Sequence, residues 1–500
     1  MAPMEKNPTV EAVKNVISTA ALLWSIALVG GLILNEQTKL SESVHPALAA
    51  CLLIFTVIWL SVVEGGQASL VGLAPVKREL YKDSHPIAYK TTAMTANGDA
   101  LDRYLLGRQF MVVFIVFTIN VSGGPIEDAE LWGLPDGVLK AFLGSGLAMI
   151  LFTTMCGQLN SQVNASHCML DYLNTWSNYL TVVVCVIIEF SGLVHASYLI
   201  QIIVAALAGS PIESREGPRS DVQNIFFFGR CFMSLGILVF AFTVTLVALF
   251  NGDTTMWEGV PNGVAVVVFF LLMSVVGMLE GMQIAFFAVA KIPKDERGDN
   301  YWAKKTCEIL YFGEAHNLSG FMIGRQLCVV SCMFFIARVT SLDIDPDADD
   351  FDGETIFGVS TGVQKFFNLG FLGALITTIV ASIAWQLVAS AFPIAMLSNP
   401  FTYILLRICL FLEGIGICNG AYVIAWIHAK IAGFQRDEIY IGTAEERREK
   451  AMADDKSVLS VGTGHIAKLP LVDAPADLKN LIETNDEVRK YMEGSMKESA

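Results

Sequence analysis

The amino-acid sequence predicts an all-α polytopic membrane protein with about ten transmembrane helices that form a five-plus-five inverted repeat. Three observations carry this prediction: an apolar composition, ten long apolar stretches, and motifs that occur twice in the same order. Of the 500 residues, 54% are hydrophobic and only 16% are charged, whereas about 25% are charged in soluble proteins. The mean hydropathy is +0.54. This composition excludes a large soluble enzyme, and the net charge of -15 with dispersed Lys and Arg excludes a nucleic-acid partner.

The apolar stretches have the length that a lipid bilayer requires, because about 20 apolar helical residues span its hydrocarbon core. No small-residue cleavage site follows the first stretch, which therefore predicts a retained helix rather than a removed signal peptide. The expected organisation is a cytoplasmic N-terminus at 1–16, a first repeat at 17–208, a second repeat at 225–430 and a cytoplasmic tail at 431–500. The ten stretches are residues 17–34, 46–74, 105–121, 138–157, 179–208, 225–250, 263–290, 321–340, 366–392 and 401–429.

The distribution of Lys and Arg predicts the orientation, because cytoplasmic loops carry the excess of positive charge. With the N-terminus inside, 13 of these residues fall on inner segments and 8 on outer segments. Both termini are therefore expected in the cytoplasm, in the plasma membrane or alternatively in an intracellular vesicle membrane. The loop Lys291–Lys305 disagrees, since it is as basic as Lys77–Arg103 although an odd number of predicted spans separates the two.

Two motifs recur at a nearly constant distance. Glu64–Gln67 (EGGQ) returns as Glu280–Gln283 (EGMQ), and Gly107–Gln109 (GRQ) returns as Gly324–Gln326. Repetition at a fixed period indicates a duplicated unit. Five spans per unit would force the second copy to enter the membrane from the other side. Inverted repeats of this kind are typical of secondary transporters, which bind a solute near the midplane and expose it alternately to the two sides.

The repeated motifs place polar side chains inside apolar stretches. The stretches that contain the two Glu-Gly-x-Gln motifs are unusually long, so each helix either tilts or breaks at its glycines. A carboxylate in hydrocarbon is costly, so such groups are candidates for a functional site. The alternative is that Glu64 pairs with Arg108, and Glu280 with Arg325, only to lock helices together. Glu, Gln and Arg together suit a solute with several hydroxyl groups. The candidate substrate-binding residues are Glu64, Gln67, Arg108, Gln109, Glu280, Gln283, Arg325 and Gln326.

The doubled Glu-Gly-x-Gln and Gly-Arg-Gln motifs closely resemble the diatom silicon transporter family. The flanking segments Glu64–Tyr81, Tyr104–Val112 and Cys168–Asp171 (CMLD) resemble it too. The resemblance is strong over Glu64–Gln326 and extends in general to all the predicted spans. It implies uptake of silicic acid coupled to Na⁺ by symport, with the motif residues in contact with the substrate. An enzyme is not expected, because the sequence of the predicted spans offers no nucleophile–base or metal constellation.

A weaker pair of sites lies in the fifth and tenth stretches. Glu189 and His195 correspond to Glu413 and Asn419, six residues apart in each copy. They are candidates for lining the path or receiving the coupling ion, and the alternative is interhelical hydrogen bonding. For the family, Cys168 and Asp171 have been read as zinc ligands. One thiolate and one carboxylate do not fill four positions, so no metal site and no cofactor are predicted here.

The polar tail offers a short candidate coiled coil. Leu478, Leu481, Asn485, Val488 and Met492 follow a heptad spacing over about two heptads. The resemblance implies a coiled coil there, through which the tail would form a homo-oligomer or bind a cytoplasmic partner. Two other functions stay open from the sequence: a passive channel for small neutral hydroxylated solutes, and a silicic acid sensor that signals through the tail.

Overall fold

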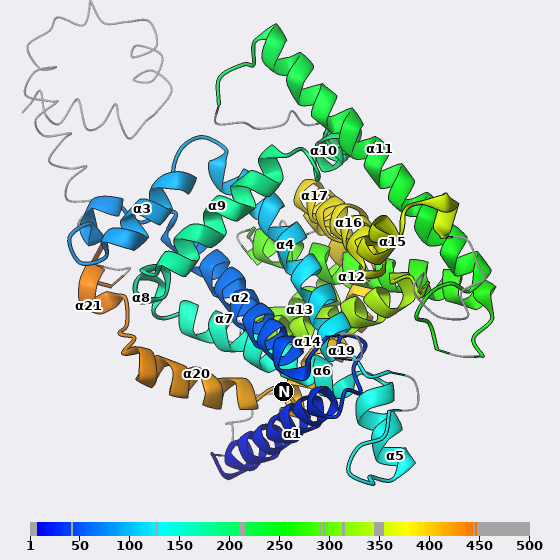
Figure 1. Cartoon of the computed structure of the whole chain (residues 1–500). Helices are drawn as coiled ribbons and strands as arrows, with labels where there is room; N and C mark the ends of the chain where they lie inside the picture. Colours follow the sequence, from blue (N-terminus) through cyan, green and yellow to red (C-terminus); the bar gives the residue numbers. More distant parts are fainter. Residues whose placement is uncertain are drawn as a thin grey trace, which may run out of the picture. The chain divides into compact units, whose positions relative to one another are not determined.

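The structure is a computed structural model that describes residues 8–447 except 42–43, 127–128, 210–215, 258, 291, 294–296, 298, 313–315, 345–354 and 444–445. The candidate coiled coil of the tail therefore lies outside the described residues. The chain divides into two compact units, Met1–Asp437 and Glu438–Ala500. Within the described part of the second unit is the short helix α21 (Glu438–Ile441). All that follows concerns the first unit, whose described elements are helical (Figure 1).

The helices of the first unit occur twice in the same order. Each of α1 to α10 has a counterpart ten helices later, and a π-helical turn between α6 and α7 returns between α16 and α17. The first set is α1 (Pro8–Leu34), α2 (Pro46–Leu73), α3 (Pro86–Thr95), α4 (Ala100–Gly123), α5 (Asp136–Leu139), α6 (Leu147–Phe152), α7 (Asn160–Ala165), α8 (Met169–Leu173), α9 (Trp176–Phe190) and α10 (Ala196–Ala208). The second set is α11 (Asp221–Asn251), α12 (Asn262–Ala290), α13 (Tyr301–Leu310), α14 (His316–Thr340), α15 (Thr361–Asn368), α16 (Phe371–Ile376), α17 (Ala384–Ala391), α18 (Pro393–Leu397), α19 (Pro400–Gly414) and α20 (Gly420–Ala432).

Fewer helices than predicted are long enough to cross a membrane. Seven helices in the described residues pass on length and composition, and the bent pair Asp136–Gly144 and Leu147–Ala165 makes up to eight. Each copy then contributes four: α1, α2, α4 and α5–α7 in the first, and α11, α12, α14 and α16–α17 in the second. The structure supports a polytopic membrane protein and leaves the prediction of ten spans unconfirmed. The two long helices do not break at the glycines of their motifs, because α2 and α12 run unbroken through Glu-Gly-x-Gln.

The predicted fifth and tenth spans are each two shorter helices. α9 has 15 residues and α10 has 13, fewer than the about 20 that cross a bilayer. Gly192 (φ 85°) and Gly416 (φ 74°) stand just beyond the ends of α9 and α19, in a left-handed conformation that ends helices and that glycine adopts without strain. A serine of the other copy then holds each break. Ser234 Oγ donates to Leu193 O and accepts from the amide of Ala196, and Ser18 Oγ does the same for Ile417 O and Gly420 N.

The two copies point in the same direction, so the predicted inversion is wrong. The α6–α7 segment shows this, because it touches both α4 and α14. Near its start, Met149 packs at Gly123, the end of α4, and lines one cavity with Phe334 and Arg338, near the end of α14. Nine residues further on, Gln158 hydrogen bonds to Gln326, in the first half of α14. The segment is therefore antiparallel to α14.

The same segment is antiparallel to α4. Gln162, still further along it, hydrogen bonds to Glu64, which pairs with Arg108 in the first half of α4. Hence α4 and α14 are parallel and end at one face. The breaks after α9 and α19 agree with this direction, because each copy then has four segments long enough to cross a membrane, and an even number of crossings would return the chain to the side from which it started. We call the face where α4 and α14 end the Asn120 end, and the opposite face, where α11 begins, the Asp221 end.

Candidate functional site

The glycine of each Gly-Arg-Gln motif allows two helices to cross at very short range. A Cβ atom at Gly107 would collide with the carbonyl oxygen of Cys185 in α9, and one at Gly324 would collide with the carbonyl oxygen of Cys409 in α19. The glycines of the Glu-Gly-x-Gln motifs are also enclosed. The phenol of Tyr172 covers Gly65, and the Met396 side chain covers Gly281. These contacts fix α4 against α9 and α2 against α8, and they do the same in the second copy.

The first polar cluster lies between α2, α4 and α7. Arg108 pairs with Glu64 at 2.6 Å, and its Nη1 donates to Gln109 Oε1 at 3.0 Å. Gln162 Nε2 donates to Glu64 Oε2, the same oxygen that Arg108 contacts, at 2.9 Å. Glu64 and Arg108 are only 4% and 5% exposed. The carboxylate is therefore both paired and hydrogen bonded, as a buried charge requires.

The second cluster contains the same residue types, but Arg325 and Gln386 contact different oxygens of Glu280. Arg325 pairs with Glu280 at 3.1 Å and donates to Gln326 Oε1 at 2.8 Å. Gln386 Nε2 donates to Glu280 Oε2 at 2.9 Å. A buried hydrogen bond of 2.7 Å from Gln326 Nε2 to Gln158 Oε1 connects this cluster to the first copy. The structure thus brings together six of the eight candidate substrate-binding residues in two clusters, one in each copy.

Both ion pairs that the sequence suggested as helix locks, Glu64–Arg108 and Glu280–Arg325, are therefore present. Each cluster carries one carboxylate and one guanidinium, so each has no net charge when both groups are ionised. Two further donors are buried without a hydrogen-bond partner in the described structure, Arg108 Nε and Arg325 Nε. An electroneutral group of amides and ion pairs suits an uncharged polar ligand better than an ion, because an ion would add an uncompensated charge to a buried site.

The remaining two candidates, Gln67 and Gln283, stand apart from these clusters. Each lies one helical turn after its glutamate, on the same face of a continuous helix, and each is half-buried. Within the described part of the chain, neither side-chain amide forms a hydrogen bond. Both amides therefore keep their donors and acceptor available, whereas the glutamates use theirs on Arg and Gln.

The four candidate path or ion residues lie at the helix breaks. Glu189 accepts a hydrogen bond of 3.1 Å from the Tyr198 hydroxyl and lies 3.6 Å from His195 Nε2. His195 is fully buried, and neither of its ring nitrogens has a hydrogen-bond partner in the described structure. In the second copy, Asn419 donates to Asn15 in α1 at 3.0 Å. Glu413 lies against Gly320, at the beginning of α14. The two copies therefore use these positions differently.

The Cys168–Asp171 segment serves a structural contact. Asp171 accepts hydrogen bonds from the amide of Gln435 at 2.6 Å and contacts His85 Nε2 at 3.1 Å. Asp437 accepts from the amides of Met169 and Leu170 at the start of α8. Among the residues described, no group of three or more His, Cys, Asp or Glu side chains is arranged to hold a metal ion. These contacts attach the segment after α20 to α8.

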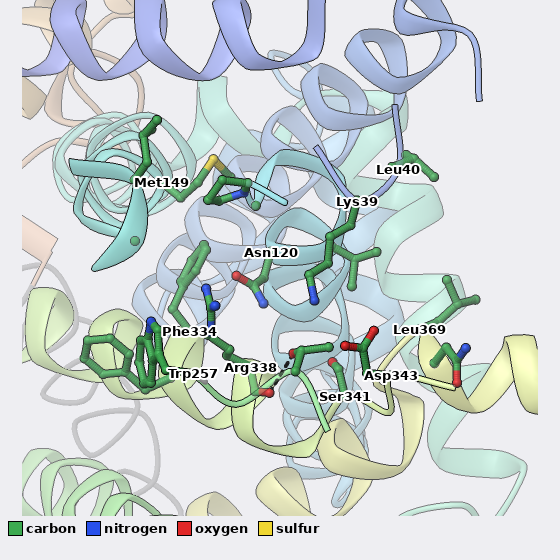
Figure 2. A pocket seen from close by; sticks show the side chains of 18 of the residues that line it. Lys39, Leu40, Asn120, Met149, Trp257, Phe334, Arg338, Ser341, Asp343 and Leu369 are labelled. Atoms are coloured by element: carbon green, nitrogen blue, oxygen red, sulfur yellow. Dashed lines mark hydrogen bonds between the residues drawn. The ribbon is translucent and has the colours of Figure 1, made fainter. Parts of the chain in front are cut away.

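Two cavities lie at opposite faces of the unit. A cavity of about 500 Å³ at the Asn120 end is lined by both copies, and Figure 2 shows Lys39, Asn120, Ser341 and Asp343 directed into the same space. A second cavity of about 610 Å³ at the Asp221 end is bounded by α4, α10, α11 and α17. Neither of these two cavities is lined by a side chain of the Glu-Gly-x-Gln or Gly-Arg-Gln motifs, but the second one reaches Gln386.

The sequence contains a signal for the glutamines that the motif search missed, Gln158, Gln162 and Gln386. The offset of 224 residues that pairs Glu189 with Glu413 also pairs Gln162 with Gln386. The same offset aligns the Thr-Thr pairs that begin the two π-helical turns, Thr153–Leu159 and Thr377–Ile383. Such turns occur frequently at functional sites. Gln158 has no counterpart, because Ser382 takes its place.

The family model described as silicon transporter matches residues 6–500. No curated protein and no solved structure matches the chain. The match extends over nearly the whole sequence and includes both polar clusters. The expectation that arose from the repeated Glu-Gly-x-Gln and Gly-Arg-Gln motifs is thereby confirmed, and the chain belongs to the silicon transporter family.

Proposed function

We propose that the protein is a secondary transporter that takes up silicic acid by symport with Na⁺ and exposes its site alternately to the two faces. The observation that carries the proposal is the pair of buried, electroneutral clusters around Glu64 and Glu280. Silicic acid is a small tetrahedral molecule whose four hydroxyl groups both donate and accept hydrogen bonds. Amide and carboxylate groups without excess charge match such a solute.

Gln67 and Gln283 are the side chains we assign to direct contact with the solute. Their amides have no hydrogen-bond partner in the described residues, and each lies a turn from a glutamate that is already engaged by an arginine. Under this proposal, the Glu–Arg pairs position helices α2 and α12, and the glutamines bind. Arg108, Gln109, Arg325 and Gln326 complete the surroundings of the solute when the two copies move relative to one another.

Parallel copies support alternating access as well as inverted ones do. Transporters with two halves related by an axis along the membrane normal also rock one half against the other. In this molecule the copies interlock, because α1 holds the break before α20 and α11 holds the break before α10. A movement of one copy is therefore transmitted to the broken helices of the other.

The parallel arrangement of the two copies also agrees with the distribution of basic residues between the two ends. The loops at the Asn120 end contain only Lys39, Lys140 and Lys365. Among the described residues, the segments before α4, α11 and α14, at the opposite end, contain Lys77, Arg78, Lys82, Lys90, Arg219, Arg297, Lys304 and Lys305. By the excess of Lys and Arg in cytoplasmic loops, we place the Asp221 end and both termini in the cytoplasm, in a plasma-membrane protein.

The helix breaks are the places we assign to the coupling ion. Sodium ions bind oxygen ligands, and unwound backbone in transporters supplies carbonyl groups. The break after α9 lies beside Glu189, and the break after α19 lies beside Glu413. Because His195 stands in one break and Asn419 in the other, the two breaks differ in chemistry, and only one of them is expected to bind Na⁺.

Uptake of silicic acid into proteoliposomes, with and without an inward Na⁺ gradient, tests the proposal. We expect saturable uptake that requires the gradient. Gln67→Ala and Gln283→Ala should each lower uptake at low silicic acid by about tenfold, because losing two hydrogen bonds of about 0.5–1.5 kcal/mol costs roughly that factor.

Ser274→Ala is the matched control. Ser274 is on α12, as Gln283 is, but it is exposed and donates to the carbonyl of Phe270 in its own helix. Its removal should leave uptake unchanged. Uptake that ignores the Na⁺ gradient would contradict the coupling, and uptake that does not saturate would instead identify a passive channel.

A further inference from the structure

The cavity at the Asp221 end reaches one of the two polar clusters. Its wall includes Tyr198 and Gln201 of α10, Asn224 of α11, and Gln386 and Ser390 of α17. Gln386 donates to Glu280 at 2.9 Å, and Glu280 pairs with Arg325 at 3.1 Å. A small molecule in the cavity can therefore contact the amide that is bonded to the Glu-Gly-x-Gln carboxylate of the second copy.

The size and lining of this cavity fit a hydrated polar solute. Its volume of about 610 Å³ is many times the about 30 Å³ that one water molecule occupies in the liquid. Its polar lining ranges from exposed to half-buried groups. Arg103 and Glu216, which form an ion pair, are each about 40% exposed. Tyr198, Gln201 and Asn224 are half-buried.

The opposite cavity does not extend as far toward the clusters. At the Asn120 end the lining includes Met149 and Phe334, and Phe334 lies eight residues after Gln326, about 12 Å along an α-helix. Phe371 of α16, two residues after the cavity-lining Leu369, packs edge-on against Phe110 and Phe114 of α4, with ring centroids 5.7 and 6.1 Å apart. Apolar rings therefore occupy the interface of α4 and α16 on this side.

We propose that the cavity at the Asp221 end is the inner part of the solute path, and that Gln386 contacts silicic acid where this path meets the Glu280 cluster. The proposal rests on the function proposed above and adds a binding residue outside the two repeated motifs. It also assigns the structure to a state in which the second cluster is open to the Asp221 end and closed to the Asn120 end.

Thiol modification at the cavity wall tests the path. Ser390 is exposed, lines the cavity and lies one turn after Gln386, so an adduct on Ser390→Cys should block the way to the cluster. Val388→Cys is the control, because Val388 is on the same helix and is exposed but does not line the cavity. Both variants are made in a Cys51→Ala background, since Cys51 is the exposed native cysteine.

We expect a membrane-impermeant thiol reagent applied at the Asp221 end to abolish most silicic acid uptake by the Ser390→Cys variant and to leave the Val388→Cys variant active. Silicic acid should slow the modification of Cys at position 390. Adding Gln386→Leu should remove this protection while the thiol still reacts, because the path remains and the contact is lost.

The outcomes separate this inference from the function on which it rests. If the Cys51→Ala parent takes up no silicic acid, the proposed function fails. If the parent is active but modification at position 390 leaves uptake intact, or the reagent acts only from the Asn120 end, the path is wrong. If silicic acid still protects after Gln386→Leu, Gln386 does not contact the solute.

Discussion

The two copies hold the same charged pair in the same way but differ in the polar groups around it. Glu64–Arg108 and Glu280–Arg325 are both buried ion pairs, and a glutamine 224 residues apart in sequence, Gln162 or Gln386, donates to each glutamate. Around these ion pairs the corresponding residues differ: Gln158 corresponds to Ser382, Tyr104 to Phe321, and His195 to Asn419.

This comparison shows which features belong to the architecture and which give each copy its own role. Side chains that hold helices together are duplicated: the Arg pairs, the crossing glycines Gly107 and Gly324, and the serines that hold the helix breaks. Among the side chains that differ, Gln158 lies at the contact between copies, and His195 and Asn419 lie at the helix breaks. Differences at these positions give the two copies different chemistry at corresponding places.

The largest expected effect comes from breaking one ion pair. Arg325→Met leaves the Glu280 carboxylate buried without its partner, which should lower the free energy of unfolding by about 3–5 kcal/mol. Arg108→Met should cost a similar amount through Glu64, if the two copies are equivalent in this respect. The measurement is the thermal unfolding midpoint in detergent, read by loss of the monodisperse protein peak.

The double variant Glu280→Met with Arg325→Met distinguishes locking from binding. Replacing both charges by apolar groups of similar size is often neutral for stability, so the midpoint should recover. Uptake should not recover, because the solute loses its polar surroundings. Recovery of both would mean that the pair only locks α12 to α14, as the alternative interpretation of the sequence holds.

A smaller effect is expected at the crossing glycines. Gly107→Ala and Gly324→Ala each place a methyl group against a main-chain carbonyl of α9 or α19, and such overpacking costs typically about 1–3 kcal/mol. Gly236→Ala in α11 is the control, since a Cβ there meets no atom within 4 Å. A midpoint loss in one copy only would show that the crossings differ, although their contacts look alike.

The sequence predicted the membrane class, the duplicated unit and the six clustered motif residues, because each depends on residue type and spacing. It did not predict the direction of the second copy. Hydropathy measures the length of an apolar run, and residues 179–208 have the length of a span whether they cross or turn back at Gly192. The sequence did contain a signal against inversion. The loop Lys291–Lys305 is as basic as Lys77–Arg103, which an inverted repeat would place on the opposite side of the membrane.

Gln162 and Gln386 were missed for a different reason. A glutamine in an apolar stretch becomes a site residue only when a neighbouring helix brings a carboxylate to it, and that neighbour is five helices away in the sequence. Here the repeat offset changes from 217 to 224 between Gln326 and Thr377, so a search at the first offset misaligns the later helices. Aligning them at the second offset would have paired the two glutamines.

The smallest predicted effect concerns the hydrogen bond that exists only once. Gln158→Ser gives the first copy the residue of the second and removes the 2.7 Å bond from Gln326, which should cost about 1 kcal/mol. Gln201→Ser is the control, because it shortens a half-buried glutamine whose side chain makes no hydrogen bond in the described structure. If the two midpoints shift equally, the Gln158–Gln326 bond contributes no stability beyond side-chain size. A larger shift for Gln158→Ser would show that the asymmetry between the copies helps to hold them together.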